Sequence, residues 1–110
     1  MSGGSKGRRS ASSATVEALA RFLGSLGDPT RLRILSLLSR GELCVCHIHG
    51  KLALPQPKVS RHLAFLRRHG LVETRRQGVW VYYRISSRLD GRRRALLKAV
   101  VEQARQPRAT

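Results

Sequence analysis

The stretch LPQPKVSRHLAFLRRHGLVETRRQGVWVYYRI, residues 54–85, carries the strongest fold signal in this 110-residue chain. Its first four residues are typical of a turn, and Pro57 favours the start of a helix because the first helical turn does not need its missing N–H. Apolar residues then recur on one face of that helix, at Val59, Leu63 and Leu66. Gly70 is typical of a helix end. The sequence therefore predicts a turn followed by a helix from Pro57 to about Gly70.

After Gly70 the pattern changes to that of β-structure. Residues 71–76 and 79–85 are rich in β-branched and aromatic side chains. The Gln77-Gly78 pair between them is typical of a tight turn. The sequence therefore predicts a β-hairpin directly after the helix.

Helical spacing predicts three helices before this stretch and one after it. The first covers residues 15–27, and the second covers 28–41, with Asp28 as its N-terminal cap. A shorter helix is expected over 42–53 and the last over 89–104. Two short helices joined by a tight turn and followed by a two-stranded wing describe a winged helix-turn-helix. The predicted fold class is therefore mainly α with a β-hairpin wing.

The chain length allows one domain with a modest core. Residues 1–13 are mostly Gly, Ser, Lys and Arg and are predicted to form a disordered basic tail. The winged helix-turn-helix domain is predicted over 14–104, with a C-terminal tail over 105–110. No apolar stretch follows the N-terminal charges, and no run approaches the roughly 20 apolar residues of a membrane span. We therefore expect a cytoplasmic protein without a membrane partner, whose cysteines are free thiols or metal ligands rather than a structural disulfide.

The charge of the chain points to a polyanionic partner. Lys and Arg number 22 against 6 Asp and Glu, which gives a net charge of +16 and a pI near 11.8. A field of this sign favours nucleic acid, and the alternative is a basic protein that binds nucleic acid without sequence preference. The chain has no nucleophile–base–acid set and no glycine-rich phosphate loop, so we do not expect an enzyme or a tightly bound cofactor.

Candidate DNA contacts lie on the helix that begins at Pro57 and on the hairpin. In a helix-turn-helix, the first turns of the second helix enter the major groove, where Arg or Lys pairs with guanine and Gln with adenine. Guanidinium groups at the tip of a wing can contact phosphates or a minor groove. The predicted DNA-binding residues are Gln56, Lys58, Ser60, Arg61 and His62 on the helix and Arg75, Arg76 and Gln77 on the hairpin. The alternative for both groups is an ordinary solvated charged surface.

The first and last predicted helices each carry an apolar stripe, and one small core cannot obviously bury both. A homodimer through these helices would bury them and would present two recognition helices to the half-sites of an imperfect inverted repeat in double-stranded DNA. The alternative is that the two helices pack against each other within one subunit.

The stretch ELCVCHIHG, residues 42–50, contains the only two cysteines, Cys44 and Cys46. They could be small core residues, a redox couple or ligands of a soft ion. Residues two apart in an α-helix point about 200° away from each other. Two thiolates on one ion lie no more than about 4.6 Å apart. If the stretch is helical, ion binding must therefore distort the start of the helix that supports the recognition helix.

Four segments in order, LGDPTRLRILSLL, ELCVC, PQPKVSRHLAFLRRHGLV and RRQGVWVYYRI, resemble the ArsR/SmtB family of metalloregulatory repressors, most closely its arsenic-responsive branch. The resemblance covers about residues 15–87. It implies a homodimeric transcriptional repressor that leaves its operator when an inducer binds Cys44 and Cys46. It also implies that the inducer is trivalent arsenic, trivalent antimony or an organoarsenical such as methylarsenite.

One position departs from the arsenic-responsive branch. Members often have a third cysteine where this chain has His49. Imidazole suits zinc, copper or cobalt better than trivalent arsenic. The alternative is therefore a repressor that responds to zinc or another soft metal through Cys44, Cys46 and His49.

Overall fold

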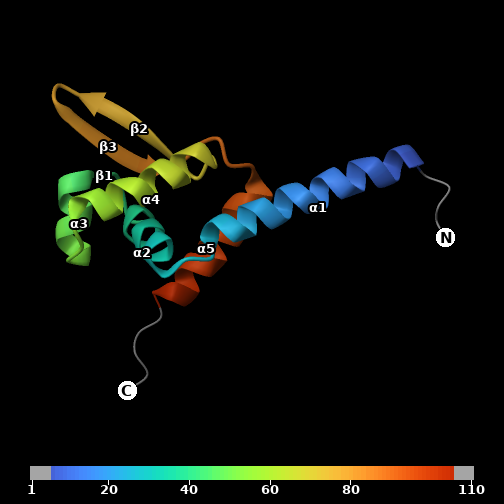
Figure 1. Cartoon of the computed structure of the whole chain (residues 1–110), viewed down its shortest axis with the longest axis horizontal. Coiled ribbons are helices and arrows are strands. Elements are labelled where there is room, and N and C mark those ends of the chain that lie inside the picture. Colours follow the sequence, from blue (N-terminus) through green and yellow to red (C-terminus); the bar gives the residue numbers. More distant parts are fainter. Residues whose placement is uncertain (1–5, 106–110) are drawn as a thin grey trace, which may run out of the picture.

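The computed structural model describes residues 6–105 and has the order of elements that the sequence predicts, with one added strand (Figure 1). The elements are α1 (Lys6–Leu26), α2 (Pro29–Leu38), β1 (Leu43–Cys44), α3 (Val45–Leu52), α4 (Gln56–Arg68), β2 (Val72–Gln77), β3 (Trp80–Ile85) and α5 (Gly91–Ala104). Helices α3 and α4 with the β2–β3 wing form a winged helix-turn-helix. The predicted fold class is therefore confirmed.

Helix α1 begins at Lys6, inside the segment 1–13 that the sequence predicts to be a disordered tail. That segment contains no proline to stop a helix from extending in the N-terminal direction. Residues 1–5 of the predicted tail, and 106–110 of the predicted C-terminal tail, lie outside the described residues. Figure 1 shows α1 extending away from the other helices, on the side opposite the wing.

Helix α2 begins as predicted. Oδ2 of Asp28 accepts a hydrogen bond from the backbone N–H of Arg31 at 3.0 Å, and Pro29 occupies the first helical position. The carboxylate thus satisfies a backbone donor that no residue of the helix can satisfy.

The helix predicted over 42–53 is wrong at its start. Leu43 and Cys44 form a short strand, β1, and α3 begins only at Val45. Cys44 has extended backbone angles (φ −83°, ψ 161°) because β1 pairs antiparallel with the free edge of β3, with Leu43 opposite Tyr83 and Cys44 opposite Tyr82. Helical spacing cannot reveal a pairing with a strand almost 40 residues away.

The sheet has the strand order β1-β3-β2. Its hairpin turn consists of Gly78 and Val79, because Gln77 already pairs with Trp80. The predicted turn, Gln77-Gly78, is therefore displaced by one residue. Gly78 has a φ of +62°, which glycine adopts without strain.

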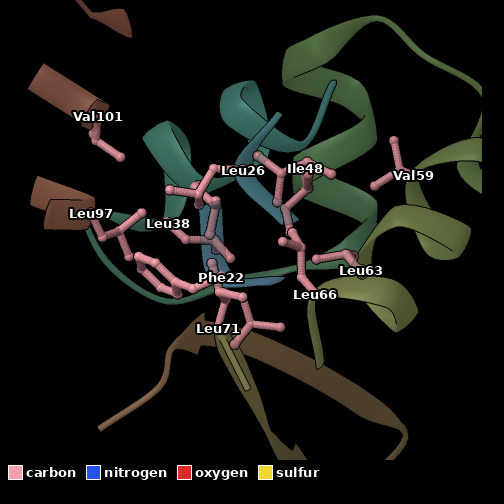
Figure 2. Close-up of a cluster of buried hydrophobic side chains, with 13 residues drawn as sticks. Phe22, Leu26, Leu38, Ile48, Val59, Leu63, Leu66, Leu71, Leu97 and Val101 are labelled. Atoms are coloured by element: carbon pink, nitrogen blue, oxygen red, sulfur yellow. The ribbon is translucent and has the colours of Figure 1, made fainter. Parts of the chain in front are cut away.

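The hydrophobic core lies among the helices and the inner face of the sheet. Helix α4 contributes the expected stripe, since Val59, Leu63 and Leu66 are fully buried (Figure 2). Ile48 of α3 and Leu97 of α5 belong to the same cluster. Because this stripe faces the core, the opposite face of α4 is presented to the outside.

The apolar stripe of α1 is only partly covered. Phe22 and Leu26 are buried, but Val16, Leu19 and Leu23 are 64%, 38% and 46% exposed. A single subunit therefore leaves part of this stripe open, as the sequence predicts. None of the helices in residues 6–105 combines the length and the apolar character that a membrane span requires.

Candidate functional site

Cys44 and Cys46 meet at the junction between β1 and α3. Cys44 is the N-cap residue of α3 and is 3% exposed, whereas Cys46 is exposed in the first turn of the helix. The two are joined by a disulfide, with a Cα–Cα distance of 5.4 Å. The prediction of free thiols is therefore wrong for this structure. The reason lies in the backbone: Cys44 is extended because it pairs with β3, and an extended Cys44 followed by a helical Cys46 removes the divergence of about 200° that an intact helix would impose.

His47 lies with the two cysteines. Its Nδ1 atom is 3.3 Å from Sγ of Cys44, and the three donor atoms of Cys44, Cys46 and His47 lie within 4.8 Å of one another. Cys44 is the N-cap residue of α3, and His47 is the third residue of the helix. Side chains at these two positions regularly meet at the start of a helix. The sequence places His47 next to Cys46 along the chain, but its Nδ1 atom reaches Sγ of Cys44 because the helix starts at Val45.

His49, the third ligand of the alternative soft-metal site, is directed elsewhere. Its Nδ1 atom lies 3.3 Å from the carbonyl oxygen of Leu54, at the other end of α3. The structure therefore groups His47 rather than His49 with the cysteines.

The donor set fits a soft or borderline metal ion. Thiolates bind soft ions, and two sulfurs with one imidazole supply three of the four ligands that zinc usually takes. An ion can bind only after reduction of the disulfide, in which a thiol reductant supplies two electrons and two protons to form two thiols.

The recognition-helix candidates lie on and beside the outer face of α4. Gln56, Lys58 and Arg61 are exposed, and Ser60 is half-buried. His62 is also half-buried, and its Nδ1 atom lies 3.9 Å from Oδ2 of Asp28. His62 thus faces the start of α2, whereas the other four candidates remain along the first turns of α4.

The wing candidates divide into two groups. Arg75 donates hydrogen bonds to Glu42, with Nη2 2.8 Å from Oε1, and its Nη1 donates to Oε1 of Gln77 at 2.7 Å. The hydrogen bond from Arg75 lowers the pKa of the Glu42 carboxyl, and the same contact raises the pKa of Arg75. Arg76 is exposed and has no ion pair among the described residues. At this edge of the wing, the guanidinium of Arg76 can therefore contact an anionic partner, whereas that of Arg75 is occupied by Glu42 and Gln77.

Two exposed apolar residues at the wing tip were not among the predicted DNA contacts. Val79 is 84% exposed and Trp80 is 54% exposed. Val79 belongs to the turn and Trp80 directly follows it, so a correct placement of the turn draws attention to both.

Lys58, Arg61 and Arg76 form no ion pair with any residue in the described part of the chain. Because the outer face of α4 and the wing both carry such cations, they offer unneutralised positive charge to a phosphate backbone.

Comparison with known proteins agrees with this geometry. The family described as bacterial regulatory protein, arsR family, matches residues 28–74. The chain is 50% identical over 78 residues to the arsenic resistance transcriptional regulator ArsR1 of Pseudomonas putida, covering 70% of this chain and 61% of that protein. It is 58% identical over 62 residues to the arsenical resistance operon repressor of Escherichia coli, covering 56% of this chain and 53% of that protein. The alignments thus span between about half and three fifths of these two relatives.

A solved structure matches over the whole length of the chain. This structure is the homodimeric winged helix-turn-helix DNA-binding domain of Mb0332 from Mycobacterium bovis, described as a possible ArsR-family transcriptional regulator. The TM-score is 0.72 with 32% identity, and the match covers 100% of this chain and 98% of that one. The agreement in fold, in sequence and in the order of the elements shows that the chain belongs to the ArsR family of bacterial regulatory proteins.

Proposed function

We propose that this protein is a DNA-binding transcriptional repressor that leaves its operator when a thiophilic ion binds Cys44 and Cys46. The observation that carries the proposal is the position of the cysteine pair. It lies at the start of α3, the first helix of the helix-turn-helix, with His47 beside it. An ion held there acts on the DNA-binding element itself.

The DNA-binding half of the proposal rests on charge and geometry. Lys58 and Arg61 are exposed on the first turns of α4, and Arg76 is exposed on the wing. The net charge of +16 adds a general attraction to the phosphate backbone. The proposed base-reading residues are Gln56, Lys58 and Arg61. The proposed phosphate contacts are Ser60 and Arg76. The remaining candidates, which are proposed to hold these contacting residues in position, are Arg75, Gln77 and His62.

The repressor is proposed to act as a homodimer on an imperfect inverted repeat. The exposed apolar residues Val16, Leu19 and Leu23 of α1, and Leu96 of α5 at 40% exposure, supply a surface that a second copy can cover. The related domain Mb0332 is described as homodimeric. Two copies related by a twofold axis present two α4 helices to two half-sites.

The proposed inducer is trivalent arsenic, trivalent antimony or methylarsenite. Two relatives are named for arsenic or arsenical resistance, and the two thiolates are soft ligands. An organoarsenical with two open valences needs no third protein ligand. The specific observation that favours a second candidate, a zinc-responsive repressor, is the imidazole of His47 at 3.3 Å from Cys44.

The test is fluorescence anisotropy of labelled DNA from upstream of the gene. The reductant is a phosphine, because dithiols compete for arsenic. The titrants are arsenite, antimonite, methylarsenite and Zn²⁺. Release by a trivalent arsenical in the wild type, and its absence in Cys44→Ser/Cys46→Ser, supports the proposal.

Other outcomes select other functions. Release by Zn²⁺ alone selects the zinc-responsive repressor, and release on removal of the reductant alone selects redox sensing by the disulfide. Equal affinity for the upstream DNA and for random DNA, undisturbed by any ion, selects a basic protein that binds nucleic acid without sequence preference.

A further inference from the structure

An ion pair spans the full width of the three-stranded sheet. Glu42 directly precedes β1, and Arg75 lies in β2, with β3 between them. The guanidinium contacts both carboxylate oxygens: Nε is 3.1 Å from Oε1 and from Oε2, and Nη2 is 2.8 Å from Oε1. The two outer strands of the sheet are therefore connected by side chains as well as through β3.

The inducer-site cysteine lies in the same row of the sheet. Cys44 pairs with Tyr82, and Tyr82 pairs on its other side with Arg75. Residues paired across neighbouring strands carry their side chains on the same face. The guanidinium of Arg75 lies 4.8 Å from the centre of the Tyr82 ring, which places it over that ring. Cys44 and Arg75 are thus separated only by Tyr82.

Strand β1 is the weakest part of this sheet. It has two residues and two register pairs, whereas β2 and β3 pair over six residues each. A pairing this short is the part of the sheet most easily displaced when Cys44 moves. Glu42 is two residues from Cys44 and must move with it.

We propose that Glu42 is a positioning residue that couples the cysteine site to the wing. In the structure, where the two cysteines form a disulfide, Glu42 holds Arg75 and so fixes β2, whose last residues are next to the wing tip. An ion that takes the place of the direct S–S bond moves the two sulfurs apart, to as much as about 4.6 Å. This movement displaces β1, withdraws the Glu42 carboxylate from Arg75 and frees the wing. This inference rests on the proposed function, since it describes how the same site acts on DNA.

The chain supplies a matched control for this ion pair. Glu73 of β2 accepts a hydrogen bond from Nε of Arg84 in β3 at 2.6 Å. This pair also joins a carboxylate to an arginine on the wing, but it does not reach β1. If the proposal is right, removing the Glu42 charge and removing the Glu73 charge have different effects.

The experiment compares the wild type with Glu42→Gln and Glu73→Gln in three measurements. The first is amide hydrogen exchange of residues 72–85, without ion and with methylarsenite. The second is the ratio of operator affinities without and with methylarsenite, measured by anisotropy. The third is methylarsenite binding, measured by mass spectrometry.

In the wild type, methylarsenite is expected to speed exchange in the wing. In Glu42→Gln, exchange is expected to be fast already without ion, and the affinity ratio is expected to fall at least fivefold while methylarsenite still binds. Glu73→Gln is expected to keep the wild-type affinity ratio. The charge-reversed pair Glu42→Arg/Arg75→Glu is expected to restore slow exchange in the wing.

The coupling would be overturned if Glu42→Gln had the hydrogen-exchange rate and the affinity ratio of the wild type. It would also be overturned if Glu42→Gln and Glu73→Gln changed these two quantities equally. Failure of the proposed function is seen separately, because no ion then releases even the wild type from its operator. In that case the exchange of the ion-free variants still decides whether Glu42 positions the wing.

Discussion

The imidazole of His47 lies with Nδ1 3.3 Å from Sγ of Cys44 because the two residues occupy the third helical position and the N-cap of α3. Cys46, between them, is exposed. The site thus has a buried sulfur, an exposed sulfur and an exposed imidazole. Because the three side chains differ in burial and in ligand type, substituting each of them is expected to have a different effect.

His47→Ala is expected to weaken Co²⁺ and Zn²⁺ binding by roughly tenfold or more, since even the loss of a residue that only supports a ligand costs that much. Arsenite binding should change much less, because imidazole is a poor ligand for it. Thiolate-to-Co²⁺ charge-transfer absorption measures the first, and competition with a dithiol measures the second. His49→Ala is the control and should leave both unchanged. A larger loss in His49→Ala than in His47→Ala would restore His49 as the third ligand.

Cys44→Ser is expected to destabilise the reduced protein by about 1–3 kcal/mol, because it buries a hydroxyl in place of a thiol. Cys44 is 3% exposed, whereas Cys46 is exposed, so Cys46→Ser should change stability by less than about 0.5 kcal/mol. Urea unfolding under a phosphine reductant measures both. Equal stability losses in the two variants would show that the burial of Cys44 has no energetic weight.

Much of the fold could be predicted because its signals are local. The stripe Val59, Leu63 and Leu66, and the cap at Asp28, depend on neighbours within one or two helical turns. The start of α3 could not be predicted in this way. Cys44 is extended because it pairs with Tyr82, and only the folded sheet brings these two residues together.

The same long-range pairing decides the candidate site. The cysteines were found from their spacing, and they do meet in space. The third donor of the alternative soft-metal site, His49, lies beside Leu54, whereas the helix start at Val45 brings His47 to the N-cap residue. Likewise, the ion pair between Glu42 and Arg75 joins residues 33 positions apart. No local pattern marks it.

Arg61→Ala is expected to cost about 1–3 kcal/mol at the cognate operator if the guanidinium reads a base. Arg61 is exposed and has no ion pair among the described residues, so the protein alone should lose little stability. Anisotropy on operator DNA and on random DNA of the same length measures the effect. Arg33→Ala, an exposed change on α2, is the charge-matched control. An equal loss of affinity on both DNAs would make Arg61 a phosphate contact instead.

Asp28→Ala is expected to lower the free energy of unfolding at pH 7 by about 1 kcal/mol, through loss of the helix cap. The backbone N–H of Arg31 lowers the pKa of this carboxyl below its ordinary value of 3.8, and the nearby His62 adds to the effect. Because the folded pKa is the lower one, the stabilisation is complete well above pH 3.8 and is lost as the pH falls through the folded value. Asp28→Asn keeps a capping oxygen and does not titrate. Urea unfolding at pH 7, 5 and 3 should show a smaller difference between the wild type and Asp28→Ala at pH 3, and a constant difference would contradict the assignment.

Leu19→Lys/Leu23→Lys is expected to raise the dimer dissociation constant at least about tenfold. The change removes two apolar side chains per subunit from the interface, and a tenfold loss of affinity corresponds to only about 1.4 kcal/mol. Both residues are at least 38% exposed in the single subunit, so the fold should survive. Sedimentation velocity across a concentration series measures the dimer, and circular dichroism checks the fold. Val79→Lys at the wing tip, 84% exposed, is the control and should leave dimerisation unchanged. A Leu19→Lys/Leu23→Lys variant that dimerises as the wild type does would place the dimer contact on another face of the molecule.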